Sequence, residues 1–374
     1  MRQLQRYRVG GVVLLGAWLA ACAPTRPGAD LTEEWLGAAA DTVLTPFGQV
    51  PRAAWMGPNR WLVVASDWDQ AVVADFTTNS YAPLGSGPGT DYQNPADVFA
   101  AGDSLYLSDW GMRRVTVWTR DGQLGGAIDL PIEARVGFPK ARDTAGRFYF
   151  EPPPTGGVDG QGLVDSGAVV RASPDLVRFD TLARLSPPPS SEVTRDQRRR
   201  LERMVFGGQD RWGVRPDGSF WVARIARNQV TWTDAAGESR RGPSLPDPVY
   251  EVTMADREEF VAQFPPELRG TVEALPFAMI KPPFEGAFTG PEGQIWLEKS
   301  RSVHDSLAVR RVHVVGDDGD LARMLVVPSL GRVIAVGEGV LLVAEQWAEG
   351  VRLLQISTTP PPAAAAIPRD SAAP

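Results

Sequence analysis

Apolar residues along this chain recur in short runs, and each run is followed by a polar turn and a second run. Trp61-Leu62-Val63-Val64 precedes Ser66-Asp67-Trp68, and Leu105-Tyr106-Leu107 precedes Ser108-Asp109-Trp110, 42 residues further on. The second copy continues through a glycine-containing loop into another apolar run over 115–118. Two short strands joined by a tight loop form a β-hairpin, so the pattern predicts a series of hairpins.

Later segments repeat this pair of apolar runs at a similar spacing. These later copies open at Phe148-Tyr149-Phe150, Phe220-Trp221-Val222, Ile295-Trp296-Leu297 and Leu341-Leu342-Val343. A small sheet has two apolar faces, and a closed ring of sheets with a period of about 40–45 residues buries both faces between neighbours. Six copies therefore predict an all-β fold, a six-bladed β-propeller over 45–358, with rings of five or seven blades as the alternatives.

The second copy also carries a recognisable repeat motif. Pro95 and Val98 stand at its start, its second strand ends in Asp109, and Arg114-Val115 opens the next strand. This pattern resembles the NHL repeat of NHL-repeat and TolB-like propellers. The resemblance implies the same six-bladed architecture; it is good in this copy and weaker in the others.

Two stretches interrupt the period, and we expect both to be short helical insertions. The first, near 192–206, is rich in arginine and has Thr194 and Gln197 at the spacing of a capping box. The second, near 253–264, begins with a similar cap at Thr253. Two roles stay open for them: a lid or partner surface, or solvated helices packed on the rim of the propeller.

The N-terminal segment has the features of an export signal. Arg2, Arg6 and Arg8 precede a short apolar run over 9–19, which ends in Leu19-Ala20-Ala21-Cys22. About 20 apolar residues are needed to span a bilayer, so this run is too short for a permanent span and is typical of a signal peptide. Its end resembles the lipobox of bacterial lipoproteins, which implies a signal peptide at 1–21, lipid on the Cys22 thiol and a lipid-anchored tether over 22–44.

The likeness to lipoproteins also bears on location and partners. Ala23 rather than aspartate follows Cys22, and in Gram-negative lipoproteins this implies the outer membrane, so we expect a cell-envelope protein held on a membrane by its lipid. The formal net charge of −7 argues against nucleic acid as a partner. The tail over 359–374 is rich in proline and alanine, and we expect it to be disordered.

Residues suited to metal or nucleophilic catalysis are few. The chain has two histidines, His304 and His313, and one cysteine, Cys22, which excludes a zinc site with three histidine ligands. Asp317-Asp318-Gly319-Asp320 lacks the other spaced ligands of a calcium loop and is interpreted as a hairpin turn. We therefore expect no catalytic residue, no metal site and no cofactor.

One set of polar residues recurs just past the second strand of the repeats. Equivalent positions on a ring converge on one face, so this set predicts a rim of mixed charge and indole rings, suited to a protein, peptide or glycan ligand. The alternative is ordinary turn chemistry, in which a polar residue ends each strand. The candidate ligand-binding residues of the rim are Asp67, Trp68, Asp109, Trp110, Arg224, Lys299 and Glu345.

Three functions fit these features. The first is an envelope propeller that binds or scaffolds a protein, peptide or glycan through one face. The second is a calcium-dependent lactonase or other hydrolase of the six-bladed kind, which would need several acidic and asparagine side chains around one calcium ion in the channel. The third is a receptor or accessory subunit of a secretion or polymer-uptake system.

Overall fold

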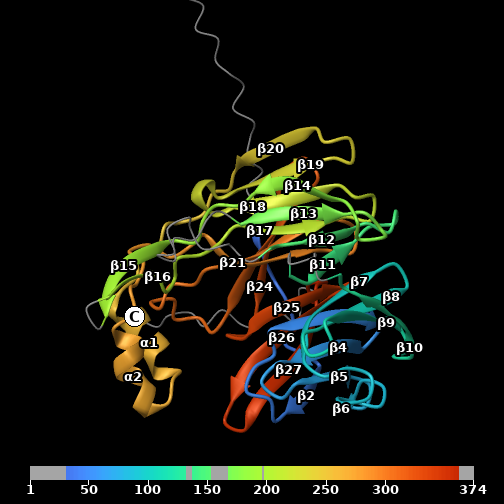
Figure 1. Cartoon of the computed structure of the whole chain (residues 1–374). Coiled ribbons are helices and arrows are strands. Elements are labelled where there is room, and N and C mark those ends of the chain that lie inside the picture. Colours follow the sequence, from blue (N-terminus) through green and yellow to red (C-terminus); the bar gives the residue numbers. More distant parts are fainter. Residues whose placement is uncertain (1–30, 132–136, 153–166, 196–197, 362–374) are drawn as a thin grey trace, which may run out of the picture. The chain divides into compact units, whose positions relative to one another are not determined.

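The computed structural model describes residues 31–131, 137–152, 167–195 and 198–361, and its strands form six sheets arranged as a propeller, with a separate two-stranded hairpin. Figure 1 shows the sheets and, beside them, the two short helices α1 (Met254–Ala262) and α2 (Pro266–Glu273). Residues 32 onward form one compact unit. Within each blade, strands that follow one another in the chain pair with one another. The predicted all-β, six-bladed architecture is confirmed.

Blades I to III are meanders of four strands each. Blade I consists of β3 (Arg52–Gly57), β4 (Arg60–Ala65), β5 (Gln70–Asp75) and β6 (Ser80–Pro83). Blade II consists of β7 (Pro95–Ala101), β8 (Ser104–Asp109), β9 (Arg114–Thr119) and β10 (Leu124–Asp129). Blade III consists of β11 (Pro139–Arg142), β12 (Phe148–Phe150), β13 (Ala168–Ala172) and β14 (Phe179–Arg184).

Blades IV to VI complete the ring. Blade IV consists of β17 (Arg211–Val214), β18 (Phe220–Arg224), β19 (Gln229–Thr233) and β20 (Ser239–Ser244), with the short 3-10 helix η1 (Ile225–Arg227) between β18 and β19. Blade V contains β21 (Phe284–Thr289), β22 (Ile295–Lys299), β23 (Arg310–Val315) and β24 (Leu321–Val327). Blade VI contains β25 (Arg332–Gly337), β26 (Val340–Trp347) and β27 (Gly350–Ser357).

The N-terminal part of the described chain supplies strands to the last two blades. β2 (Asp41–Thr45) pairs antiparallel with β27 and so becomes the fourth strand of blade VI. β1 (Glu33–Trp35) pairs parallel with β24 and adds a fifth strand to blade V. The predicted tether over 22–44 is therefore wrong in its second half, because residues 33–35 and 41–44 belong to sheets and cover edges that would otherwise be open.

The hydrophobic core is divided among the interfaces between neighbouring blades. One buried cluster joins Trp61 of blade I to Leu342 of blade VI, and a second joins Leu62 of blade I to Leu105 of blade II. Four further clusters lie between the remaining pairs of neighbours. Trp61 and Leu62 are adjacent and point to opposite faces of β4, as alternation along a strand requires. The two apolar faces of each sheet thus explain why the repeats close into a ring.

The prediction of a helix near 192–206 is wrong. β15 (Ser190–Arg195) and β16 (Arg198–Arg203) pair antiparallel there, with Thr194 opposite Arg199. A helix would place Arg199 and Arg203 one turn apart on one face, where like charges repel. In the hairpin, Arg199 instead pairs with Glu192 at 3.3 Å.

The helix expected near 253–264 is present as α1 (Met254–Ala262), and a second helix, α2 (Pro266–Glu273), follows it. Thr253 and Asp256 form the predicted capping box. The rings of Phe206, Phe260 and Phe277 pack together, with centroids 5.7–6.1 Å apart, and so join the end of the first insertion to the second. Neither helix has the length and apolar character needed to cross a membrane, within the part of the chain that is described.

The predicted signal peptide at 1–21 and the lipidation site at Cys22 lie outside the described residues, as does the tail from 362 onward. These predictions stay predictions.

Candidate ligand site at the channel mouth

The first strand of every blade lines a central channel whose cavity measures about 1070 Å³. These inner strands are β3, β7, β11, β17, β21 and β25. In each blade the first strand pairs antiparallel with the second, so that Arg52 lies opposite Val64 and Arg332 lies opposite Ala344. All six inner strands therefore begin at the end of the channel where the second strands finish. Residues at the start of the inner strands therefore face one another across one opening.

Each inner strand brings one charged residue to this opening. Four of the six are cations and two are carboxylates, and all six line the channel. We call this set the charged mouth; its members are Arg52, Asp97, Lys140, Arg211, Glu285 and Arg332.

Irregular pairing helps to direct two of these side chains. The ladder between β11 and β12 skips Lys140, and the ladder between β21 and β22 skips Glu285. A β-bulge bends its strand and changes the direction of the extra residue, and bulges are frequent beside functional sites. The two bulges allow Lys140 and Glu285 to reach the channel at positions that the regular alternation of a strand does not dictate.

Most charges of the mouth are paired. Arg52 Nε lies 3.5 Å from Asp97, and Lys140 Nζ lies 2.8 Å from Glu151, a residue just past β12. Arg332 lies 3.1 Å from both Glu285 and Glu298 of β22. Arg310 of β23 also contacts both of these glutamates. Ion pairing thus neutralises the carboxylates of the mouth from within the protein.

Arg211 is the exception among the cations of the mouth. Within the described residues its guanidinium has no carboxylate within 4.0 Å, and its one hydrogen bond runs from Nη2 to the backbone carbonyl of Glu285, at 3.1 Å. Burial lowers the pKa of Arg211, the cations Arg52 and Arg332 lower it further, and the more distant carboxylates Glu151 and Glu298 oppose the shift. An arginine has five N–H donors, so Arg211 retains donors that can bind an anion in the channel.

Two carboxyl groups, Asp97 of the mouth and the neighbouring Glu298, have raised pKa values. Burial raises the pKa of Asp97 above its usual range, although Arg52 and Lys140 oppose the shift. Burial also raises the pKa of Glu298, against the opposing effects of Arg332 and Arg310. Protonation of either carboxyl would leave the arginines less neutralised and the mouth more cationic.

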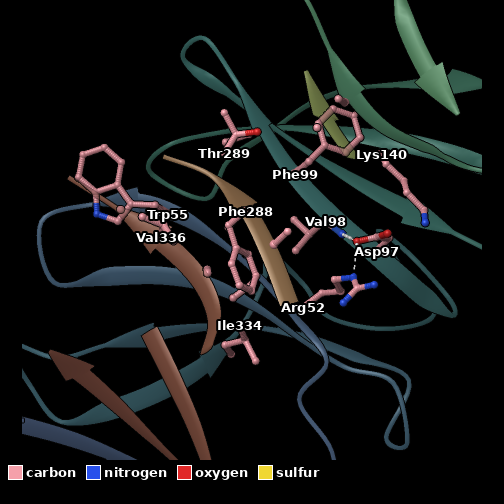
Figure 2. A pocket seen from close by; sticks show the side chains of 18 of the residues that line it. Arg52, Trp55, Asp97, Val98, Phe99, Lys140, Phe288, Thr289, Ile334 and Val336 are labelled. Atoms are coloured by element: carbon pink, nitrogen blue, oxygen red, sulfur yellow. Dashed lines mark hydrogen bonds and ion pairs between the residues drawn. The ribbon is translucent and has the colours of Figure 1, made fainter. Parts of the chain in front are cut away.

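Below the mouth the channel wall becomes apolar. Figure 2 shows Arg52, Asp97 and Lys140 at one side of the pocket and the side chains of Val98, Phe288 and Ile334 facing the space beside them. Further apolar side chains that line the channel are Trp55, Phe99 and Val336. The cavity therefore combines a charged opening with an apolar middle section, while Arg142 and Thr289, at the far ends of β11 and β21, add polar groups deeper in the channel. A charged opening next to an apolar section is suited to an amphipathic molecule.

The rim residues singled out in the sequence lie at the same end of the blades as the charged mouth. Asp109, Arg224 and Lys299 end their second strands, whereas Asp67 stands just past β4 and Glu345 lies near the end of β26. The repeat alignment that grouped them agrees with the observed strands. None of these five side chains lines the channel.

Asp109 and Arg224 are engaged in local contacts. The carboxylate of Asp109 is fully buried and accepts hydrogen bonds from four backbone N–H groups, those of Gln93, Asn94, Gly111 and Met112. Arg224 donates to the carboxylate of Asp210 at 2.8 Å and to the carbonyl of Arg184 at 2.7 Å. Both side chains hold loops together, which is the turn chemistry considered as the alternative for the rim.

The other charged rim residues also have partners within the protein. Asp67 accepts from the backbone N–H of Gly48 at 2.7 Å, and Glu345 pairs with Arg352 at 2.9 Å. Lys299 is buried and lies 2.5 Å from Asp247. Burial lowers the pKa of Lys299, and Asp247 opposes this shift.

The two rim tryptophans remain accessible. Trp68 is 45% exposed and Trp110 is 55% exposed. Trp68 contacts Phe47 edge to face, and Trp110 contacts Phe138 in the same way at 4.8 Å. These indoles and Asp67 are the exposed rim residues, and they retain surface for a partner.

The lactonase alternative requires a calcium ion in the channel. Calcium takes six to eight oxygen ligands, several of them carboxylates. Across the described ranges, no group of three or more aspartate, glutamate, histidine or cysteine side chains is placed to hold a metal. The carboxylates around the mouth instead contact arginine or lysine. The described residues therefore do not fit a calcium ion of this kind.

Sequence reasoning missed the charged mouth because it followed the ends of the second strands. The available signal was a charged residue near the start of the first strand in every copy, such as Arg52, Asp97 and Arg211. Each of these residues looks like an ordinary polar strand end. Only the closed ring brings them to one opening.

Comparison with known proteins places the chain in no sequence family: no family model matches it, and no curated protein matches it. Solved structures resemble its fold. A gluconolactonase from Xanthomonas campestris is 14% identical, with a TM-score of 0.46 over 88% of this chain and 96% of that one. The calcium-binding protein regucalcin from Agrobacterium tumefaciens is 10% identical, with a TM-score of 0.42 over 87% of this chain and 96% of that one.

A third similar structure, virginiamycin B lyase from Staphylococcus aureus, is 10% identical, with a TM-score of 0.41 over 85% of this chain and 98% of that one. At such identities the likeness concerns the fold alone. The class that the chain's own strands define is the six-bladed β-propeller.

Proposed function

We propose that this protein is a binding module of the cell envelope whose channel takes a small amphipathic anion. The anionic group binds at the charged mouth, and the apolar part of the ligand enters the channel. The observation that carries the proposal is Arg211, a half-buried guanidinium in the mouth with no carboxylate within 4.0 Å among the described residues. A buried charge is costly unless it is paired, and an anionic ligand supplies the missing partner.

The rest of the mouth supports the same ligand chemistry. Three further cations, Arg52, Lys140 and Arg332, stand in the mouth with Arg211, and the carboxyls Asp97 and Glu298 have raised pKa values. Arginine binds carboxylate, phosphate and sulfate-like groups through two parallel N–H donors. The apolar wall formed by residues such as Val98 and Phe288 would cover the body of the ligand.

Anchoring on a membrane is the second part of the proposal. It rests on Leu19-Ala20-Ala21-Cys22, the segment that resembles a lipobox. Lipid on Cys22 would hold the propeller at the membrane surface, since two or more acyl chains anchor a protein stably. The variant Cys22→Ser has no thiol to acylate, so it should lose labelling by a palmitate analogue and remain a precursor. A mature-sized, lipid-labelled Cys22→Ser protein would contradict this part.

Binding of octanoate to the purified full-length protein tests the ligand proposal. Trp55 and Trp212 line the channel, so their fluorescence should change on titration. Arg211→Met should weaken binding by about tenfold to a hundredfold, because a hydrogen bond to a charged group contributes about 1.5–3 kcal/mol. Octanol and octylamine, which lack the anionic group, should bind more weakly than octanoate.

Arg241→Met is the matched control, because Arg241 is exposed on β20, the outer strand of the same blade as Arg211. It should bind octanoate as the wild type does. Equal binding of octanoate and octanol, or no loss in Arg211→Met, would contradict the proposal. Stoichiometric calcium in the purified protein, together with lactone hydrolysis that a chelator abolishes, would favour the lactonase alternative instead.

A further inference from the structure

A second cavity of about 460 Å³ lies beside blade V, apart from the channel. Its wall combines the ends of β22 and β23 with the segment after β20. Glu298 and Lys299 are adjacent in β22, yet Glu298 lines the channel and Lys299 lines this cavity. We call it the blade V pocket; nothing in the sequence pattern pointed to it.

The charges that line the blade V pocket neutralise one another. Lys299 Nζ lies 2.5 Å from Asp247 Oδ2. Arg311 contacts Glu33 at 2.7 Å and Asp305 at 2.5 Å. A charged ligand would have to displace one of these partners and leave it unpaired, which is unfavourable in a largely buried site. The pocket is therefore suited to an uncharged ligand.

Two polar groups in the pocket lack partners. Ser300 Oγ and His313 Nδ1 make no hydrogen bond with any described residue, and both residues are buried, at 7% exposure each. His313 Nδ1 lies 3.3 Å from Asp247 Oδ1 without the alignment of a hydrogen bond. A buried polar group without a partner is costly, so these two atoms mark where a ligand or bound water supplies hydrogen bonds.

The remaining wall is apolar. Pro246, Pro248, Pro283 and Met324 line it. A hydroxyl group can both donate and accept, and so can satisfy a serine hydroxyl and an imidazole together. A sugar ring offers several hydroxyls on its edge and an apolar face of C–H groups, which match the polar and apolar parts of this wall.

We propose that the blade V pocket binds an uncharged polyhydroxylated molecule, such as a neutral saccharide, through Ser300 and His313. This inference is independent of the anion proposed for the channel. The two sites lie on different sides of β22, so each can be tested while the other is occupied.

Saturation-transfer NMR on the full chain tests the inference, with methyl β-glucoside and N-acetylglucosamine as neutral probes. Both should receive saturation from the protein, while glucuronate and glucosamine, which carry a charge, should bind at least several-fold more weakly. Ser300→Ala should weaken binding of the neutral probes by about three- to tenfold, the effect of one lost hydrogen bond. His313→Gln should weaken it to a similar degree.

Ser306→Ala is the matched control, since Ser306 is exposed in the same loop region and does not line the pocket. It should bind the neutral probes as the wild type does, and saturation with octanoate should not compete with them. The inference is overturned by any of three results: no saturation of either neutral probe, equal binding of charged and neutral probes, or undiminished binding in both Ser300→Ala and His313→Gln.

Discussion

Equivalent positions of the repeat have taken on different energetic roles. Asp67 and Asp109 stand at the same point of blades I and II. Asp109 is fully buried and accepts four backbone N–H groups, whereas Asp67 accepts one, from Gly48, near the surface. The sequence pattern showed their equivalence, but burial and the number of partners depend on how each neighbouring loop folds.

This difference predicts unequal effects of the same substitution. Asp109→Ala should lower the free energy of unfolding by about 2–4 kcal/mol, because it leaves several buried N–H donors without an acceptor. Asp67→Ala should lower it by less than about 1 kcal/mol. Urea unfolding followed by tryptophan fluorescence measures both. Equal losses in the two variants would show that Asp109 does not hold its loop as described.

His313 gives a prediction about pH. Burial lowers its pKa from 6.5 to about 4, an effect that Asp247 opposes and Lys299 reinforces. Between these two values the unfolded chain binds a proton that the folded protein does not, so this residue makes stability rise with pH across that window. Below about pH 4 both states are protonated, and the contribution becomes constant.

The measurement compares unfolding free energies of the wild type and His313→Gln at pH 4.5 and pH 7. Carboxyl groups titrate in both proteins, so only the difference between them reports on His313. The wild type should lose more stability on acidification than the variant, by on the order of 2 kcal/mol. Identical losses would mean that His313 is not buried in its neutral form.

At the scale of elements, local signals were reliable where nothing outside the segment competed with them. The capping box at Thr253 correctly predicted the start of α1. The similar signal at Thr194 predicted a helix where the structure has the hairpin of β15 and β16. Arginines in this segment would repel one another on one face of a helix, whereas the hairpin separates them. The capping pattern alone does not include this repulsion.

The cap of α1 can be tested directly. Thr253 Oγ1 accepts from the N–H of Asp256 at 3.3 Å, and Asp256 accepts from the N–H of Thr253 at 2.8 Å. Thr253→Ala should destabilise α1 by about 1 kcal/mol, seen as faster amide exchange in the helix. Thr271→Ala is the control, because Thr271 is exposed on α2 and caps neither helix. It should leave amide exchange in the helices unchanged or slow it, since alanine favours helix. Unchanged exchange in Thr253→Ala would contradict the cap.

The charged mouth shows what the sequence could not reveal at this scale. Lys140 and Glu285 occupy bulges, where one strand has an extra residue relative to its neighbour. A repeat aligned by spacing assumes regular pairing and assigns such residues to the wrong face. The blade count was predictable because apolar runs fix it, whereas the direction of these two side chains depends on the ladder itself.

At the scale of the whole molecule, the ring is closed by two strands from opposite ends of the described chain. β2 pairs with β27, with Val43 opposite Leu353. Val43 is fully buried in the cluster between blades VI and I, whereas Leu44 is 51% exposed. The apolar face of β2 therefore contributes to the closure of the propeller, and its other face contacts solvent.

Substitution of these neighbours tests the closure. Val43→Asp places an unpaired charge in the core and should lower the free energy of unfolding by at least about 3 kcal/mol. Leu44→Asp should change it by less than about 1 kcal/mol. Both follow from thermal or urea unfolding. Similar effects of the two substitutions would mean that β2 does not close blade VI in the observed register.

A crystal structure of the protein with ω-bromooctanoate tests anion binding in the channel, because anomalous scattering locates the bromine and density locates the carboxylate. The carboxylate should lie within hydrogen-bond distance of Arg211, and the bromine should lie inside the channel among residues such as Val98 and Phe288. A carboxylate at the opposite opening, a ligand outside the channel, or a calcium ion held by the carboxylates of the mouth would contradict the proposed binding.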